Sequence, residues 1–304
     1  MKFLFLILFF IPYVHAQNCQ FELSLGNPTV LPTNVNQVLE QNFIVTKKSP
    51  VLLACDYFRL YFSKGNANSY QRQAFNTELE KYNYNLHSNI NMSGILKGVN
   101  DALNSNEYIQ GGSLLSNTPY SGSFFLSLPA LSTQTNQRAG FYRDSIQVDI
   151  YRVALLNIYY QTSQVFQVNI AIPTNLNVSI VDEGGAFNIN STTKVFDFGF
   201  LQDNQELRAD VIVNSNTPYQ LRISSFNNGK LKKGASEINY DLKFNSQTVN
   251  LAGSSSSPTE VASSSGPTQI AGNRYNLRVK IMNLPQNPEA GVYEDALTLT
   301  AIAN

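Results

Sequence analysis

Few residues in this chain are of the types that perform chemistry. Beyond the first 16 residues there is one histidine, His87, and there are two cysteines, Cys19 and Cys55. A nucleophilic thiol needs a basic partner, and nothing in the sequence pairs His87 with either cysteine. The sequence contains no CxxC or HExxH spacing, no phosphate-binding loop and no dinucleotide-binding glycine motif. We therefore expect no enzyme, no metal site and no cofactor.

The N-terminal segment and the cysteines indicate export. Residues 1–16 hold one lysine, an apolar run and a final Ala16, which is the layout of a cleaved signal peptide. A membrane anchor is the alternative, but the run is shorter than the roughly 20 residues that span a bilayer. Two cysteines in a secreted chain usually pair. We therefore predict a disulfide between Cys19 and Cys55 in preference to a catalytic thiol.

Composition excludes two further classes of protein. The 304 residues include 21 basic and 21 acidic side chains, so there is no excess of cations to neutralise nucleic-acid phosphates. The 19 phenylalanines and 16 tyrosines supply far more core material than an acidic disordered chain contains. A chain of this length is expected to form about two domains.

The elements that carry these residues are mostly strands. Polar and apolar side chains alternate over 145–150, 277–281 and 296–300, which is the pattern of strands with one face on a core. Weak helical spacing occurs only at 71–81 and 94–103. The serine-rich segment, residues 254–267, has little to bury and is predicted to be a surface loop. The sequence thus favours an all-β chain of sandwiches or barrels.

An internal repeat divides the chain. Residues 139–148 and 290–299 both read Ala-Gly-x-Tyr-x-Asp and then alternate, and Tyr84 corresponds to Tyr240 earlier in each copy. The repeated residues are Gly140, Tyr142 and Asp144, and Gly291, Tyr293 and Asp295. Glycine suits a turn with positive φ, tyrosine packs its ring on the core, and aspartate caps turn amides. We interpret all six as fold-stabilising rather than catalytic, and predict two copies of one β domain, at 17–162 and 163–304.

The second copy resembles a known family. The resembling segments are residues 196–200, 211–221, 224–231, 238–242 and 290–295. Together they resemble the spore coat protein U domain family, which includes the pilins of archaic chaperone–usher pili. The resemblance implies two tandem immunoglobulin-like β-sandwich domains of the pilin type, of which the C-terminal one lacks its last strand.

The resemblance also implies partners. A periplasmic chaperone, and later the adjacent pilin at the usher, would add a strand beside the acceptor edge formed by Leu297, Leu299 and Ala301. A disulfide from Cys19 to Cys55 would leave almost no free N-terminal donor segment. With two domains, the chain then resembles a tip adhesin, which is secreted through the periplasm and displayed on the cell surface at the end of a pilus.

A loop of the first domain is the candidate contact with an abiotic or host surface. Leu114, Leu115 and Tyr120 lie among glycine, serine, asparagine and proline, and exposed apolar residues can adsorb to surfaces. Their alternative role is ordinary cover of the core. Two other functions remain open: a secreted structural coat or matrix protein, and a free carbohydrate-binding protein in which tyrosine replaces the absent tryptophan.

Overall fold

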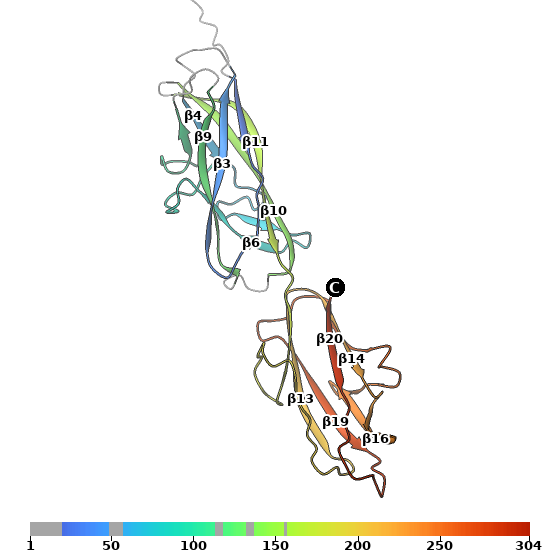
Figure 1. Ribbon diagram of the computed structural model, residues 1–304. Helices are drawn as coiled ribbons and strands as arrows, with labels where there is room; N and C mark the ends of the chain where they lie inside the picture. Colours follow the sequence, from blue (N-terminus) through green and yellow to red (C-terminus); the bar gives the residue numbers. More distant parts are fainter. Residues whose placement is uncertain (1–19, 49–56, 113–117, 132–136, 155–156) are drawn as a thin grey trace, which may run out of the picture.

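The computed structural model describes residues 20–48, 57–112, 118–131, 137–154 and 157–304. The regular elements of these residues are β-strands, which form two sandwiches that lie end to end (Figure 1). The predicted all-β fold class is confirmed. None of the described residues forms a helix long and apolar enough to cross a membrane.

The first sandwich packs a four-stranded sheet on a seven-stranded one. The four-stranded sheet has the order β1 (Phe21–Leu25), β3 (Gln37–Lys47), β9 (Tyr120–Leu128), β7 (Asn85–His87). The other has the order β2 (Thr29–Val30), β11 (Asn157–Ile172), β10 (Gly140–Ala154), β4 (Tyr57–Phe62), β8 (Ile109–Gly111), with β5 (Gln73–Phe75) and β6 (Lys81–Asn83) paired beside β10. Aromatic rings fill the space between the sheets: Phe124 meets Phe62 and Phe166, each with ring centroids 5.1 Å apart.

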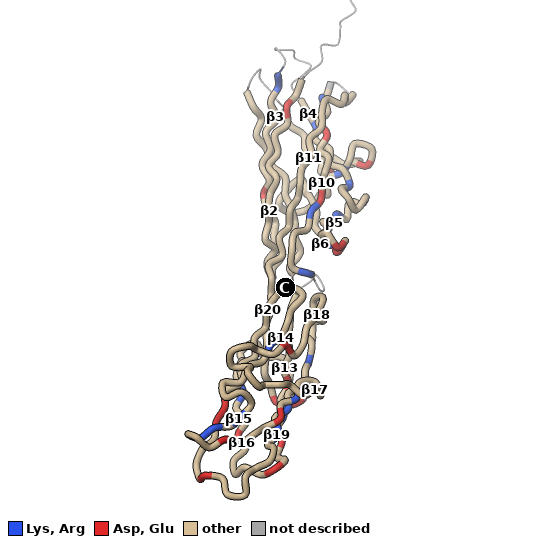
Figure 2. Tube along the Cα trace, turned by 90° about the vertical axis from the view of Figure 1, so that its right-hand side faces the viewer, with Lys and Arg blue, Asp and Glu red and all other residues tan. Residues whose placement is uncertain are grey.

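The second sandwich packs a six-stranded sheet on a three-stranded one. The larger sheet has the order β12 (Leu176–Val181), β13 (Glu206–Ser215), β19 (Asn273–Met282), β16 (Ser236–Phe244), β15 (Lys230–Lys233), with β17 (Gln247–Thr248) paired to β16. The smaller has the order β18 (Thr259–Ser264), β14 (Tyr219–Ser225), β20 (Leu297–Ala303). The C-terminus lies at the junction with the first sandwich, and β20 runs toward it (Figures 1 and 2).

The chain passes from one core to the other later than the sequence pattern predicts. Residues 157–172 form one strand that pairs with β10 throughout, and Phe166, Val168 and Ile170 belong to the first core. The boundary at 162/163 therefore falls inside β11. The second core begins with Leu176. The alternation near residue 165 is the continuation of a long hairpin strand, not the start of a new set of strands.

Two local expectations are wrong. Residues 71–81 and 94–103 form short strands, turns and extended chain instead of helices. In each segment the buried residues lie two apart, at Arg72 and Ala74 and at Gly94 and Leu96, which is the spacing of an extended chain. The serine-rich segment is not only loop, since it contains β18, which pairs with β14. An edge strand with one face in water needs few apolar residues, which is why composition hid it.

Candidate functional site

The last strand of the second sandwich has a free edge. β20 pairs with β14 in antiparallel register from Ser225↔Leu297 to Tyr219↔Ala303, and with no other strand of the described residues. Leu297, Leu299 and Ala301 face inward and pack on the second core. The backbone N–H and C=O groups on the outer side of β20 are therefore available to a further strand.

Inward side chains of this edge strand are less buried than those at the edge of the first sandwich. On β1, Phe21 and Leu23 are 7% and 8% exposed. On β20, Leu297, Leu299 and Ala301 are only half-buried. The first core is thus closed at its β1 edge, whereas the second core still exposes apolar surface beside β20.

The same opening extends to the facing sheet. The edge strand β12 approaches β20 across the sandwich, and its Leu176, Val178 and Ile180 are also half-buried against the core. We call these six residues of β12 and β20 the open side of the second core. The sequence pattern predicted an edge at Leu297, Leu299 and Ala301 of β20 and gave no such prediction for β12; the alternation of residues 176–180 indicates a strand but not its place at an edge.

A buried carboxylate anchors a turn in the first sandwich. Asp144 on β10 is fully buried and accepts hydrogen bonds from the Tyr84 hydroxyl at 2.6 Å, the Asn66 amide at 2.7 Å and the Ser145 amide at 2.8 Å. Burial and the nearby Asp144 charge raise the pKa of Tyr84 well above its ordinary value, so this phenol stays a donor. The carboxylate joins β10 to the turn after β4.

The repeated carboxylate makes the matching set of bonds in the second sandwich. Asp295 accepts from the Tyr240 and Ser225 hydroxyls and from the amides of Asn227 and Ala296, both at 2.9 Å. Because Asp295 stands just before β20 and Ser225 ends β14, the carboxylate fixes the start of the candidate acceptor strand. The duplication seen in the sequence is therefore also a duplication of hydrogen-bonding geometry.

The other repeated residues hold the backbone around these carboxylates. Gly140 and Gly291 have φ of 137° and 143°, a region that favours glycine. Tyr142 is buried, and its hydroxyl donates to the Arg138 carbonyl at 2.9 Å. Tyr293 is half-buried against the second core. The contacts described for these repeated residues are with other residues of their own sandwich.

The predicted surface loop is only partly described. Leu114 and Leu115 lie outside the described residues, as do the signal segment and both Cys19 and Cys55. Tyr120 opens β9, and its ring lies 5.2 Å from that of Phe58 and 6.2 Å from that of Phe43. It is half-buried cover of the first core. Among the described residues no cluster of histidine, cysteine, aspartate or glutamate is suited to a metal ion.

The class of molecule is thus an all-β chain of two sandwiches that lie end to end, the first closed at its β1 edge and the second with an open side. No protein-family model and no curated protein matches the sequence. Among solved structures, one similar chain belongs to the complex of the chaperone CsuC with the tip adhesion subunit CsuE, from archaic chaperone–usher Csu pili of Acinetobacter baumannii. It is 14% identical, with 92% of this chain and 99% of that chain covered and a TM-score of 0.41.

Two further structures are similar to the same extent. The CupB6 tip adhesin of Pseudomonas aeruginosa is 10% identical, with 93% of this chain and 94% of that chain covered and a TM-score of 0.44. CfaE, the adhesive subunit of the CFA/I fimbria of enterotoxigenic Escherichia coli, is 12% identical, with 91% and 92% covered and a TM-score of 0.39. At these values neither a family nor an activity of this chain follows from the likeness.

Proposed function

We propose that the chain is the tip adhesin of a chaperone–usher fibre. Its second sandwich accepts a donor strand beside β20, first from a periplasmic chaperone and then, at the usher, from the adjacent pilin. Its first sandwich is presented at the cell surface to an abiotic or host surface. The two sandwiches act as two domains that meet between Ile172 and Leu176.

The open side of the second core is the observation that carries this proposal. A free strand edge above half-buried leucines is an aggregation hazard in a secreted protein unless another strand covers it. Strand addition covers both the free edge and the half-buried leucines, because the added backbone pairs with β20 and its alternate side chains fill the exposed core. The resemblance of the second half to pilin-type domains supports the same assignment.

The closed first core supports the position at the tip. Phe21 and Leu23 are buried at its edge, so this sandwich needs no added strand and is free to bind. We also propose that the Cys19–Cys55 disulfide holds the segment before β1 against its own domain. A subunit that accepts a strand but donates none occupies the end of a fibre.

The test is to supply the missing strand in the same chain. A short turn and a peptide with alternating leucine and threonine are appended after Asn304, so that the peptide can run back antiparallel to β20. Burying about four apolar side chains at about 2 kcal/mol each and forming about six backbone hydrogen bonds at about 1 kcal/mol each outweighs the cost of about 1.5 kcal/mol for ordering each of about seven residues. The net gain of about 3 kcal/mol should raise the melting temperature of the second sandwich by about 10 °C. The amides of 297–303 that point away from β14 should become protected from hydrogen exchange.

The matched control carries serine at the inward positions of the same extension. It should change neither the melting temperature nor the exchange. Equal effects of both extensions, or full protection of the β20 amides in the unextended chain, would overturn the proposal. Immunogold labelling then separates the tip role from a coat or matrix role, since a tip subunit labels fibre ends and a coat protein labels a continuous layer.

A further inference from the structure

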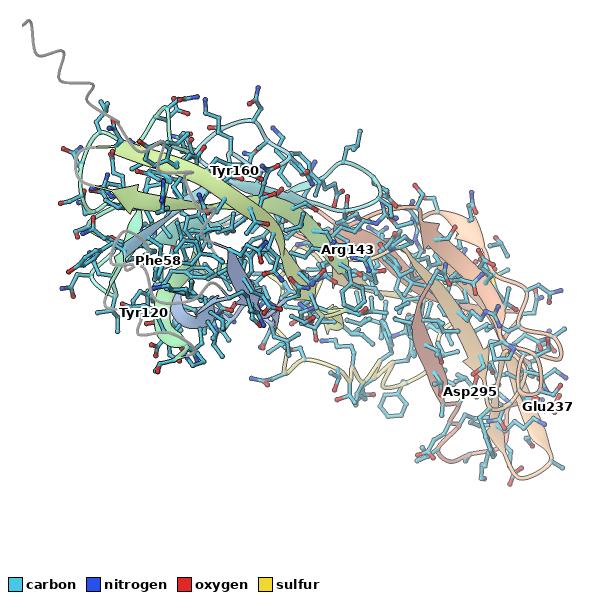
Figure 3. The ribbon with its side chains drawn as sticks, turned by 90° about the horizontal axis from the view of Figure 1, so that it is seen from above. Phe58, Tyr120, Arg143, Tyr160, Glu237 and Asp295 are labelled. Carbon is cyan, nitrogen blue, oxygen red and sulfur yellow. The ribbon has the colours of Figure 1, made fainter. Side chains whose placement is uncertain are left out.

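A row of tyrosines lies on the outer face of the larger sheet of the first sandwich. Tyr61 on β4 lies between Tyr108 and Tyr151, with ring centroids 5.4 Å and 5.3 Å away. Tyr160 on β11 is the direct cross-strand partner of Tyr151, and their rings are 5.6 Å apart at 73°. We call these four residues the tyrosine row. Figure 3 labels Tyr160 on the β10–β11 side of the sandwich, away from Tyr120 on β9.

The row presents a rigid exposed ring. Tyr61 is only 3% exposed because its neighbours cover it, whereas Tyr160 is 54% exposed. Edge-to-face contact with Tyr151 holds the Tyr160 ring without covering it. The Arg59 guanidinium lies 4.5 Å from the Tyr108 ring centroid and donates to Gln110 at 3.0 Å, so the far end of the row is also fixed.

A polar hollow adjoins the row on the same face. Its volume is about 550 Å³, and it is lined by residues that include Lys64, Asn66, Asn68, Tyr70, Asp101 and Gln147. Gln147 connects it to the row, because its side-chain amide donates to Asp149 at 2.7 Å and Asp149 is the cross-strand partner of Tyr61. Four residues of β10 separate Gln147 from Tyr151, which is about 13 Å along a strand.

The wall of the hollow is held by internal hydrogen bonds. The Tyr70 hydroxyl accepts from the Gly98 amide at 2.7 Å and donates to Asp101 at 2.8 Å. Lys64 lies 3.3 Å from the same carboxylate. Lys64 and Asp101 are the two charged side chains that line the hollow, and they neutralise each other. The remaining polar lining is hydroxyl and amide groups.

We propose that this face, the hollow together with the tyrosine row, binds an uncharged oligosaccharide. Flat apolar faces of sugar rings pack on exposed tyrosine, and sugar hydroxyls, which both donate and accept, match the amides, hydroxyls and carboxylate of the hollow. A charged ligand would meet no net charge of opposite sign there. A bare apolar surface would form no hydrogen bonds with the polar lining and would displace water from it, which is unfavourable. The inference rests on the proposed adhesin role only for its biological setting.

The position of the face suits such a ligand. β10 and β11 form an antiparallel hairpin whose β11 end leads into the second sandwich, so the tyrosine row lies toward the opposite, distal end (Figure 1). Lysine, arginine, aspartate and glutamate are scattered along both sandwiches (Figure 2), in keeping with recognition that does not depend on charge.

The test uses the full chain on immobilised cello-, chito-, malto- and galacto-oligosaccharides, with a sulfated polysaccharide and bare polystyrene as comparison surfaces. At least one uncharged series should bind. Tyr160→Ala should weaken that binding about tenfold or more, the effect of removing an aromatic anchor. Gln147→Ala should weaken it as well, while Tyr160→Phe, which keeps the ring, should stay within about threefold of the unaltered chain.

The control variant is Phe200→Ala, which removes a 95% exposed ring from the other sandwich and should not change binding. Binding to none of the oligosaccharides, sugar binding unaffected by Tyr160→Ala, or a Tyr160-dependent attachment to polystyrene alone would each overturn the inference. Because sugar binding is measured on the first sandwich and strand addition on β20, either proposal can fail while the other stands.

Discussion

Replacing Asp144 by alanine should destabilise the first sandwich and spare the second. The side chain is fully buried and accepts three hydrogen bonds of 2.6–2.8 Å. Among the three donor residues, Tyr84 is buried, with 4% of its surface exposed, so its hydroxyl cannot form a hydrogen bond to water instead. We expect the free energy of unfolding of the first sandwich to fall by about 3 kcal/mol. The unpaired buried Tyr84 hydroxyl costs about 1–3 kcal/mol, and the other two hydrogen bonds are also lost, but removing a buried charge offsets part of this cost.

A double-mutant cycle isolates the central bond. Tyr84→Phe removes the donor and keeps the ring, and should cost about 1–2 kcal/mol. If the Tyr84–Asp144 bond carries the effect, the two substitutions should be non-additive by about 1.5–3 kcal/mol, as is usual for a hydrogen bond to a charged group. The surface variant Glu40→Gln, at an exposed position of β3, should change stability by less than about 0.5 kcal/mol.

Hydrogen exchange measured peptide by peptide is the appropriate assay, because two sandwiches that unfold separately have no single free energy of unfolding. A loss of about 3 kcal/mol lowers the protection of amides in β4 and β10 on the order of 100-fold, with β13 and β19 unchanged. Asp295→Ala should lower the protection of amides in the second sandwich and leave β4 and β10 unchanged. The decrease should be smaller, since Asp295 is half-buried. Unchanged protection in Asp144→Ala, or equal losses in both sandwiches, would refute the reasoning.

Three other substitutions test contacts elsewhere. Glu107 is bonded to Lys97 at 2.6 Å, and this bond, with those from nearby backbone amides, lowers the pKa of Glu107 to about 2. Its stabilisation should be complete above its ordinary pKa of 4.5 and lost as the pH falls toward 2; thermal melts of Glu107→Gln should lack this dependence. Arg72 is buried and donates to backbone carbonyls, so Arg72→Met should cost about 2 kcal/mol or more in urea denaturation of the first sandwich. The buried Ser254 hydroxyl accepts from the Ser225 amide at 3.0 Å, so Ser254→Ala should cost about 1 kcal/mol in the second sandwich; an unchanged midpoint would contradict this.

Sequence alone was sufficient for the features that depend on local pattern. Alternation predicted strands at 145–150, 277–281 and 296–300. The first two lie within β10 and β19, and the third begins one residue before β20. The repeat paired Asp144 with Asp295, and the structure gives both carboxylates a tyrosine hydroxyl and two backbone amides. Such features are accessible because a strand's period and a turn's side-chain chemistry are set by neighbours along the chain.

Tertiary structure decided which strands lie at an edge and what covers each face. The segment 163–172 looks like the start of a domain until its pairing with β10 is known, and the serine-rich β18 is a strand only because β14 supplies its partner. Alternation says that Leu297 and Leu299 share a face, but their half-burial beside β12 follows from strand order. The tyrosine row likewise brings Tyr61 of β4 and Tyr108 of a loop to the β10–β11 hairpin, which lies far from both in the chain. Edges, openings and shared faces arise from long-range pairing, which no local pattern encodes.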